Sequence, residues 1–169
     1  MQNDSKKPEN ETPGWYALKV FYNRTEAVLD EIRNLVRDCY VPGRIVASLM
    51  FVFTTPSDLE LIRRDRYERL KVYTHPGTRE PCRIPEKEME IFRFVTGIDD
   101  KKMTLVDPDA LHFKKGEKVR VTDGIFKGAE GYVMRIKGNK RLVVSIQGVA
   151  AVATSYIPSA YLEKMENDS

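Results

Sequence analysis

GEKVRVTDGIFKGAEGYV, residues 116–133, is the stretch that decides the fold of the C-terminal part of the chain. Val119 and Val121 alternate with polar residues, a pattern typical of a strand with one face in a core. The glycines that follow permit the positive φ angles of tight turns. A phosphate-binding loop is the alternative for these glycines, but no Gly-Lys-Ser/Thr follows and no helical pattern begins there. The stretch therefore predicts strands joined by glycine turns.

The residues after this stretch continue the same pattern. Segments 132–136 and 142–146 are rich in β-formers, Gly138-Asn139 separates them, and Gly148 follows the second. Short strands at regular spacing with glycine at the turns indicate a small antiparallel barrel. The quoted stretch resembles the KOW motif, and the resemblance rests on Gly116, Val119, Val121, Gly124, Phe126, Gly128, Gly131 and Val133.

The N-terminal half has the pattern of a mixed α/β domain. Segments 15–21, 49–54 and 70–73 are apolar, aromatic or β-branched and of strand length. A capping box of Asn23 and Glu26 predicts the start of a first helix. The apolar stripe of that helix comprises Val28, Leu29, Ile32, Leu35 and Val36.

Two further helices are expected in this half. Ser57 and Glu60 repeat the capping-box spacing and predict a short second helix. Pro85 suits the first turn of a third helix, because its missing N–H has no helical partner there, and Gly97 ends that helix. The third helix has an apolar face of Met89, Ile91, Phe92 and Val95.

The order of these elements resembles the N-terminal domain of the NusG family. The resemblance rests on Trp15-Tyr16, the first helix, Val41-Pro42, Phe51-Val52 and the helix near Pro85. It implies an α+β fold, with an N-terminal α/β sandwich-like domain and a C-terminal SH3-like KOW barrel. The expected organisation is a disordered tail over 1–13, a NusG-type domain over 14–97, a linker over 98–112 and a KOW domain over 113–165.

Departures from the general family pattern favour a specialised paralogue. Ala47-Ser48-Leu49-Met50 replaces the family's aromatic lead-in to the strand, and Gln147-Gly148-Val149 replaces its Phe-Gly-Arg segment. Ala129 stands where the family has a second Phe of the first barrel turn. The pattern looks similar to the RfaH and UpxY regulators, the latter of polysaccharide operons.

Composition sets limits on the class of protein. Hydrophobic residues make up 41% and charged residues 31%, and no apolar run is long enough to cross a membrane. Residues 1–12 lack the apolar segment of a secretory signal, so we expect a cytoplasmic protein. Cys39 and Cys82 make neither a disulfide framework nor a paired-ligand zinc motif, and His75 and His112 lie at no metal-ligand spacing. We expect no metal, no cofactor and no enzymatic activity.

Positive charge is concentrated in two places. Residues 113–145 hold nine Lys or Arg against three acids, and a second cluster comprises Arg63, Arg64, Arg66, Arg69 and Lys71. Such clusters suit a phosphate backbone, although a run of charge is also typical of an ordinary solvated surface. Both interpretations stay open for the second cluster.

The resemblance implies a transcription elongation regulator that acts as an antiterminator without chemistry of its own. In the family, the N-terminal domain bridges the clamp helices and the opposite side of the RNA polymerase cleft, which suppresses pausing. The residues expected at the polymerase contact are Leu49, Phe51, Phe53 and Tyr73. We expect Phe51→Ala to abolish this contact at a cost in stability below about 1 kcal/mol, less than a core Phe would cost.

Other partners follow from the same resemblance. A non-template DNA strand, or nascent RNA, would contact Asn23, Arg24, Arg63, Arg66 and Arg69. Ala129 and Gln147 replace two aromatic residues, so the contact of the barrel with a ribosomal protein is expected to be weak or lost. We expect a monomer without a membrane partner. The alternative is a KOW-containing RNA-binding or ribosome-associated protein, which would not need the long N-terminal domain.

Overall fold

The computed structural model describes residues 11–107 and 116–166. The predicted tail and linker therefore fall largely or partly outside the described residues, as do residues 113–115 of the predicted barrel domain. Within the described ranges the chain divides into two compact units, one of residues 11–41 and 47–84 and the other of residues 42–46, 85–107 and 116–166. Each unit is described below by itself.

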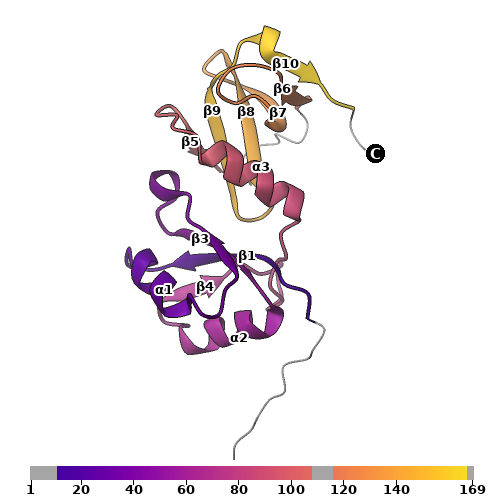
Figure 1. Ribbon diagram of the computed structural model, residues 1–169. Coiled ribbons are helices and arrows are strands. Elements are labelled where there is room, and N and C mark those ends of the chain that lie inside the picture. The colour runs from indigo at the N-terminus through magenta and orange to yellow at the C-terminus, as the bar shows by residue number, and fades with distance from the viewer. Residues whose placement is uncertain (1–10, 108–115, 167–169) are drawn as a thin grey trace, which may run out of the picture. The chain divides into compact units, whose positions relative to one another are not determined.

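The first unit is a four-stranded antiparallel sheet with two helices on one face (Figure 1). The strand order is β2-β3-β1-β4, and the longest pairing, β1 with β3, sets Trp15 opposite Phe53 and Ala17 opposite Phe51. The elements are β1 (Gly14–Val20), α1 (Thr25–Ile32), β2 (Asp38–Tyr40), the 3₁₀ turn η1 (Gly43–Ile45, which belongs to the second unit), β3 (Leu49–Thr54), α2 (Pro56–Asp65) and β4 (Leu70–Val72).

The core of this unit lies between the sheet and its helices. Alternate strand residues such as Leu18 and Val52 point toward Ile32 of α1 and Ile62 of α2, and all four are fully buried. Leu35 and Val36, predicted in the stripe of the first helix, lie beyond its end at Ile32, yet they still pack against this core. The hydrophobic pattern therefore located the buried residues better than it located the end of the helix.

Both predicted capping boxes are wrong in detail. Tyr22 and Asn23 have φ angles of 61° and 53°, so Asn23 lies in a left-handed turn, and Arg24 is the N-cap of α1 without a side-chain hydrogen bond. At α2 the cap is Thr55, whose hydroxyl accepts the N–H of Asp58 at 3.2 Å. Pro56 can follow directly, because the first helical position needs no N–H donor.

The second unit is a six-stranded antiparallel sheet of order β10-β6-β7-β8-β9-β5, curved into a small barrel, with α3 against β8 (Figure 1). The elements are α3 (Glu86–Thr96), β5 (Thr104–Val106), β6 (Lys118–Val121), β7 (Glu130–Ile136), β8 (Asn139–Ile146), β9 (Ala150–Tyr156), η3 (Ser159–Tyr161) and β10 (Leu162–Lys164). Together with the first unit this architecture confirms the expected α+β fold class.

The segment before the barrel is more ordered than a linker. Thr104–Val106 forms β5, which pairs with β9, and the Asp100 carboxylate accepts the N–H of Ser155 at 2.8 Å. The expected boundary at Gly97 follows α3, whereas the compact units divide before α3, at Ile84. The functional domain limits stay a prediction.

Gly131 explains why the KOW-like motif needs a glycine where β7 begins. A Cβ there would lie 2.5 Å from the carbonyl oxygen of Val143 and 3.0 Å from a methyl group of Leu142. A real Cβ essentially never lies so close to another heavy atom, and because the nearest atom here is a backbone oxygen, the backbone would have to shift. The motif glycine is therefore a requirement of close strand packing.

Candidate functional site

The face of the first sheet opposite its helices is aromatic. Because side chains alternate along a strand, the residues between the helix-facing ones point the other way. This aromatic face comprises Trp15, Tyr40, Phe51, Phe53 and Tyr73. The Trp15 and Phe53 rings lie 5.4 Å apart, and the Phe51 ring stacks on Tyr40 at 6.4 Å. Both helices of the unit pack on the opposite face.

The structure places the four residues predicted for the polymerase contact on this face, at unequal depths. Leu49 and Phe51 are fully buried, with 1% and 0% of their surface exposed, whereas Phe53 and Tyr73 are half-buried. Burial raises the pKa of the Tyr73 phenol, so its hydroxyl stays protonated at neutral pH. Phe53 and Tyr73 are thus the accessible members of the set.

The small stability cost expected for Phe51→Ala does not fit this burial, whereas the polymerase contact of Phe51 stays a prediction. Removing a fully buried phenylalanine side chain leaves a cavity and typically costs about 3–5 kcal/mol. Loss of binding by that variant would not separate a contact from a folding defect. The sequence alone could not show this, since a strand that is apolar at every position hides which residues are covered.

The predicted nucleic-acid residues fall into two groups. Arg66 and Arg69 both bind the Glu31 carboxylate: Arg66 Nε lies 3.2 Å from Oε2, and Arg69 donates a hydrogen bond to Oε1. Arg63 donates to the carbonyl of Arg79 at 2.8 Å. These three arginines link α1, α2 and the following segments. Because each guanidinium group already has a hydrogen-bond partner within the fold, less of its positive charge is available to a nucleic acid.

Asn23 and Arg24 form the second group, in an exposed turn. Here the structure adds two residues that sequence reasoning missed. Tyr22 is 81% exposed, and Tyr67, in the turn after α2, is 72% exposed. A hydrogen bond of 2.8 Å from the N–H of Phe21 to the carbonyl of Arg69 joins these two turns. An aromatic residue next to arginine in a turn was the available signal, and base stacking needs such exposed rings.

In the second unit, α3 contacts the barrel edge expected to bind a ribosomal protein. The Glu88 carboxylate accepts the N–H of Gln147 at 2.7 Å, and Lys87 Nζ lies 3.5 Å from Glu130 Oε2. Arg120 also pairs with Glu130, at 2.8 Å, and this hydrogen bond, before the charge of Lys87, holds the pKa of Glu130 below its ordinary value. Ala129 is buried, while the Gln147 side chain is exposed.

Among residues 11–107 and 116–166, no three His, Cys, Asp or Glu side chains gather as a metal site. Cys39 and Cys82 are free, and burial raises the pKa of the Cys82 thiol, which keeps it protonated. In the same ranges no helix has the length and apolar character to cross a membrane.

Comparisons with known proteins bear on the fold. No family model matches the chain, and no curated protein matches it. A structure of Thermotoga maritima NusG, reported for its domain interaction, is similar with a TM-score of 0.50 and 20% sequence identity, over 92% of this chain and 98% of that chain. At this identity the likeness establishes the fold.

Two conformations of the MjSpt4:Spt5 complex are also similar, at 15% identity. Their TM-scores are 0.35 and 0.33, and each match covers 90% of this chain and 97% or 98% of that chain.

The hydrogen bonds of Arg66 and Arg69 to the Glu31 carboxylate predict a pH-dependent contribution to the stability of the fold. The hydrogen bond from Arg69, followed by that from Arg66, holds the pKa of Glu31 below its ordinary value of 4.5. A lowered folded-state pKa means that the carboxylate stabilises the protein at neutral pH and that this contribution is lost as pH falls through the folded pKa. Glu31→Gln should therefore lower the free energy of unfolding at neutral pH, and the difference from wild type should shrink below about pH 4.

Urea unfolding across this pH range measures the effect. Asp30→Asn is the matched control, because Asp30 pairs with Arg33 at 3.0 Å but both side chains are well exposed, and such pairs contribute little. Equal and pH-independent effects of the two variants would contradict a clamp at Glu31.

Proposed function

We propose that this chain is a transcription elongation regulator that binds RNA polymerase through the aromatic face and suppresses pausing or termination. The observation that carries the proposal is an aromatic sheet surface whose own two helices pack on the other side. The NusG-like fold supports it, because the same sheet position is the one that the sequence resemblance assigns to the clamp helices. A factor that bridges the polymerase cleft favours the closed clamp by binding that state better.

The departures from the general family pattern, at 47–50 and 147–149, support a role at specific operons, such as polysaccharide biosynthesis loci. The alternative is a KOW-containing RNA-binding or ribosome-associated protein. The positive charge of the barrel favours this alternative. However, RNA binding by the barrel would not account for the aromatic face of the first sheet. Polymerase subunits or ribosomal RNA among the endogenous partners distinguish the two.

The polymerase contact is testable at its accessible residues. Phe53→Ala with Tyr73→Ala should reduce the affinity for purified RNA polymerase by at least about tenfold, because interface aromatic residues commonly contribute about 2 kcal/mol or more each. Since both side chains are half-buried, the cost in stability should stay below that of a core Phe, about 3–5 kcal/mol. Binding is measured by interferometry and folding by thermal unfolding.

Tyr156→Ala is the matched control, because Tyr156 is an exposed aromatic residue of the barrel. If the double variant proves unstable, Phe53→Leu keeps the apolar volume and should still weaken binding. A folded double variant with wild-type affinity would contradict the assigned surface.

We assign the proposed contact with unpaired DNA, or nascent RNA, chiefly to Tyr22, Asn23 and Arg24, with Arg63, Arg66 and Arg69 as partly committed neighbours. Tyr22→Ala with Arg24→Gln should weaken recruitment to the elongation complex and lower its dependence on salt, because an exposed stacking ring and an exposed cation are lost. Filter binding to elongation complexes over a salt series measures this. Unchanged affinity and salt slope would leave this turn as an ordinary solvated surface.

The barrel is expected to bind a ribosomal protein weakly or not at all. Ala129 is buried and Gln147 is polar, so two anchoring aromatic side chains are absent from this edge, and the barrel would then act without recruiting ribosomes. NMR titration of a segment over 99–169, which keeps β5 on β9, with the small-subunit ribosomal protein measures the contact. Micromolar binding with shifts centred on Gln147 would contradict this expectation.

A further inference from the structure

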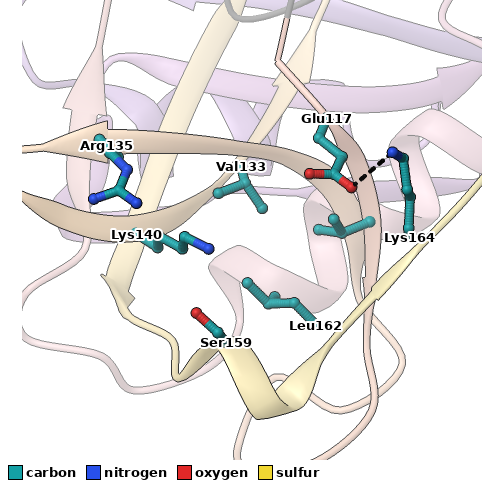
Figure 2. Close-up of a pocket in the computed structure, with 8 residues that line it drawn as sticks. Glu117, Val133, Arg135, Lys140, Ser159, Leu162 and Lys164 are labelled. Atoms are coloured by element: carbon teal, nitrogen blue, oxygen red, sulfur yellow. Dashed lines mark ion pairs between the residues drawn. The ribbon is translucent and has the colours of Figure 1, made fainter.

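One end of the barrel holds a pocket of about 380 Å³, which residues of β6, β7, β8 and β10 line together (Figure 2). Its floor is aliphatic and consists of Val119, Val133 and Leu162. Figure 2 shows Val133 and Leu162 beside the same space, with Lys140 extending toward Ser159. The volume is at the lower end of the range of ligand pockets, so the space suits one apolar side chain.

Two cations at this pocket face each other. Arg135 and Lys140 both line it, and they are directly opposite partners in the β7–β8 register. Like charges at opposite positions destabilise a strand pair. The acid at the pocket, Glu117, pairs with Lys164 at 3.5 Å, and Glu130, at the other end of β7, pairs with cations of α3 and β6. Neither acid neutralises the two opposed cations, so the pocket suits an anion from outside the chain.

The strand β10, which forms one wall of the pocket, is an edge strand. Among the described residues it pairs with β6 on one side and with no strand on the other. The N–H of Met165 donates to the carbonyl of Lys118 on the β6 side, at 2.9 Å. Because alternate residues of an antiparallel strand bond to the same neighbour, the C=O of Leu162 and both backbone groups of Lys164 point to the free side. Such an edge can accept an extended peptide as a further strand.

We propose that this end of the barrel binds the C-terminal residue of a partner polypeptide, an apolar residue with a free carboxylate. The partner's backbone pairs with the free edge of β10, and its last side chain lies on the aliphatic floor. Its carboxylate accepts charge-assisted hydrogen bonds from Arg135 and Lys140 and a hydrogen bond from the hydroxyl of Ser159. Leu162 and Lys164 belong to both the edge and the pocket, so the strand and the terminal residue are bound side by side.

The chemistry of the pocket favours a terminal residue over an inorganic anion. One residue at a chain end supplies a carboxylate and an apolar group together, whereas an inorganic anion would leave the floor of Val119, Val133 and Leu162 uncovered. The free edge of β10 in turn favours a polypeptide over a small organic acid, because only a polypeptide has a backbone that can pair with a strand. This inference goes beyond the proposed function and does not require polymerase.

The test uses the full chain and fluorescent peptides of about eight residues that end in Val, Leu or Phe, each as a free acid and as an amide. Fluorescence anisotropy gives the affinities. The best free acid should bind at least about tenfold more tightly than its amide, because the amide cannot accept the charge-assisted hydrogen bonds of a carboxylate. Arg135→Gln with Lys140→Gln should reduce the affinity for the acid to that for the amide and leave the affinity for the amide close to its wild-type value.

Lys127→Gln with Lys137→Gln is the matched control, because it removes the same charge from two exposed cations of the barrel that do not line the pocket. This control should bind both forms of the peptide as the wild type does. In NMR spectra of the wild-type chain, the free acid should shift the amide signals over 162–164, as expected for a strand added to β10. The comparison of acid with amide on the wild-type chain does not depend on the folding of any variant.

Four results would overturn the proposal. The first is equal affinity for the acid and the amide, or no binding of any of these peptides up to about 1 mM. The second is a variant of Arg135 and Lys140 that binds the acid as tightly as the control variant does. The third is a short branched carboxylic acid that binds as tightly as the peptide, which would assign the pocket to a small molecule. The fourth is a single-stranded RNA that binds these residues more tightly than every peptide.

Discussion

The pairing of β1 with β3 is the constraint on which the first unit depends. In its register, Trp15 is opposite Phe53 and Ala17 is opposite Phe51, while Tyr16 and Leu18 face the helices with Val52 and Met50. A shift of one residue in a strand would move every side chain of that strand to the other face. The helices can cover only one apolar face, so this register also creates the aromatic face on the other side.

In the second unit, carboxylate side chains connect the elements outside the barrel to its strands. Asp100 accepts the N–H of Ser155, Glu88 accepts that of Gln147, and Glu130 pairs with both Arg120 and Lys87. These contacts attach α3 and the segment before β5 to the barrel. Glu130, the first residue of β7, thus links α3 to the barrel, whereas residues 131–162 contain no Asp or Glu.

Much of the fold could be predicted because hydrophobic alternation and glycine spacing are local properties. They located β1, β3 and the strands from β6 to β8, and the KOW-like glycines located the barrel turns. The three-residue strands β2 and β5 were missed, since each is defined by its partner strand and has too few residues to show a period. The cap of α1 was misplaced because Asn23 adopts the left-handed conformation that its side chain tolerates.

The candidate sites could be predicted only in part, because burial and contacts between distant residues do not appear in local sequence patterns. The family resemblance assigned Phe53 and Tyr73 to the expected contact surface, but the complete burial of Phe51 is a tertiary property that no local pattern shows. The clamp of Arg66 and Arg69 on Glu31 joins residues more than thirty positions apart, so no local pattern marks it. The exposure of Tyr22 and Tyr67 likewise follows from the turns that carry them.

Site-specific cross-linking tests the central claim, that the helix-free face of the first sheet binds RNA polymerase, most directly. A photoreactive phenylalanine analogue at position 53 or 73 of the full chain, irradiated with purified polymerase, should form an adduct with a large polymerase subunit. The same analogue at position 30, on the exposed side of α1, should not. Adducts of equal yield from all three positions, or adducts from position 30 alone, would contradict the account.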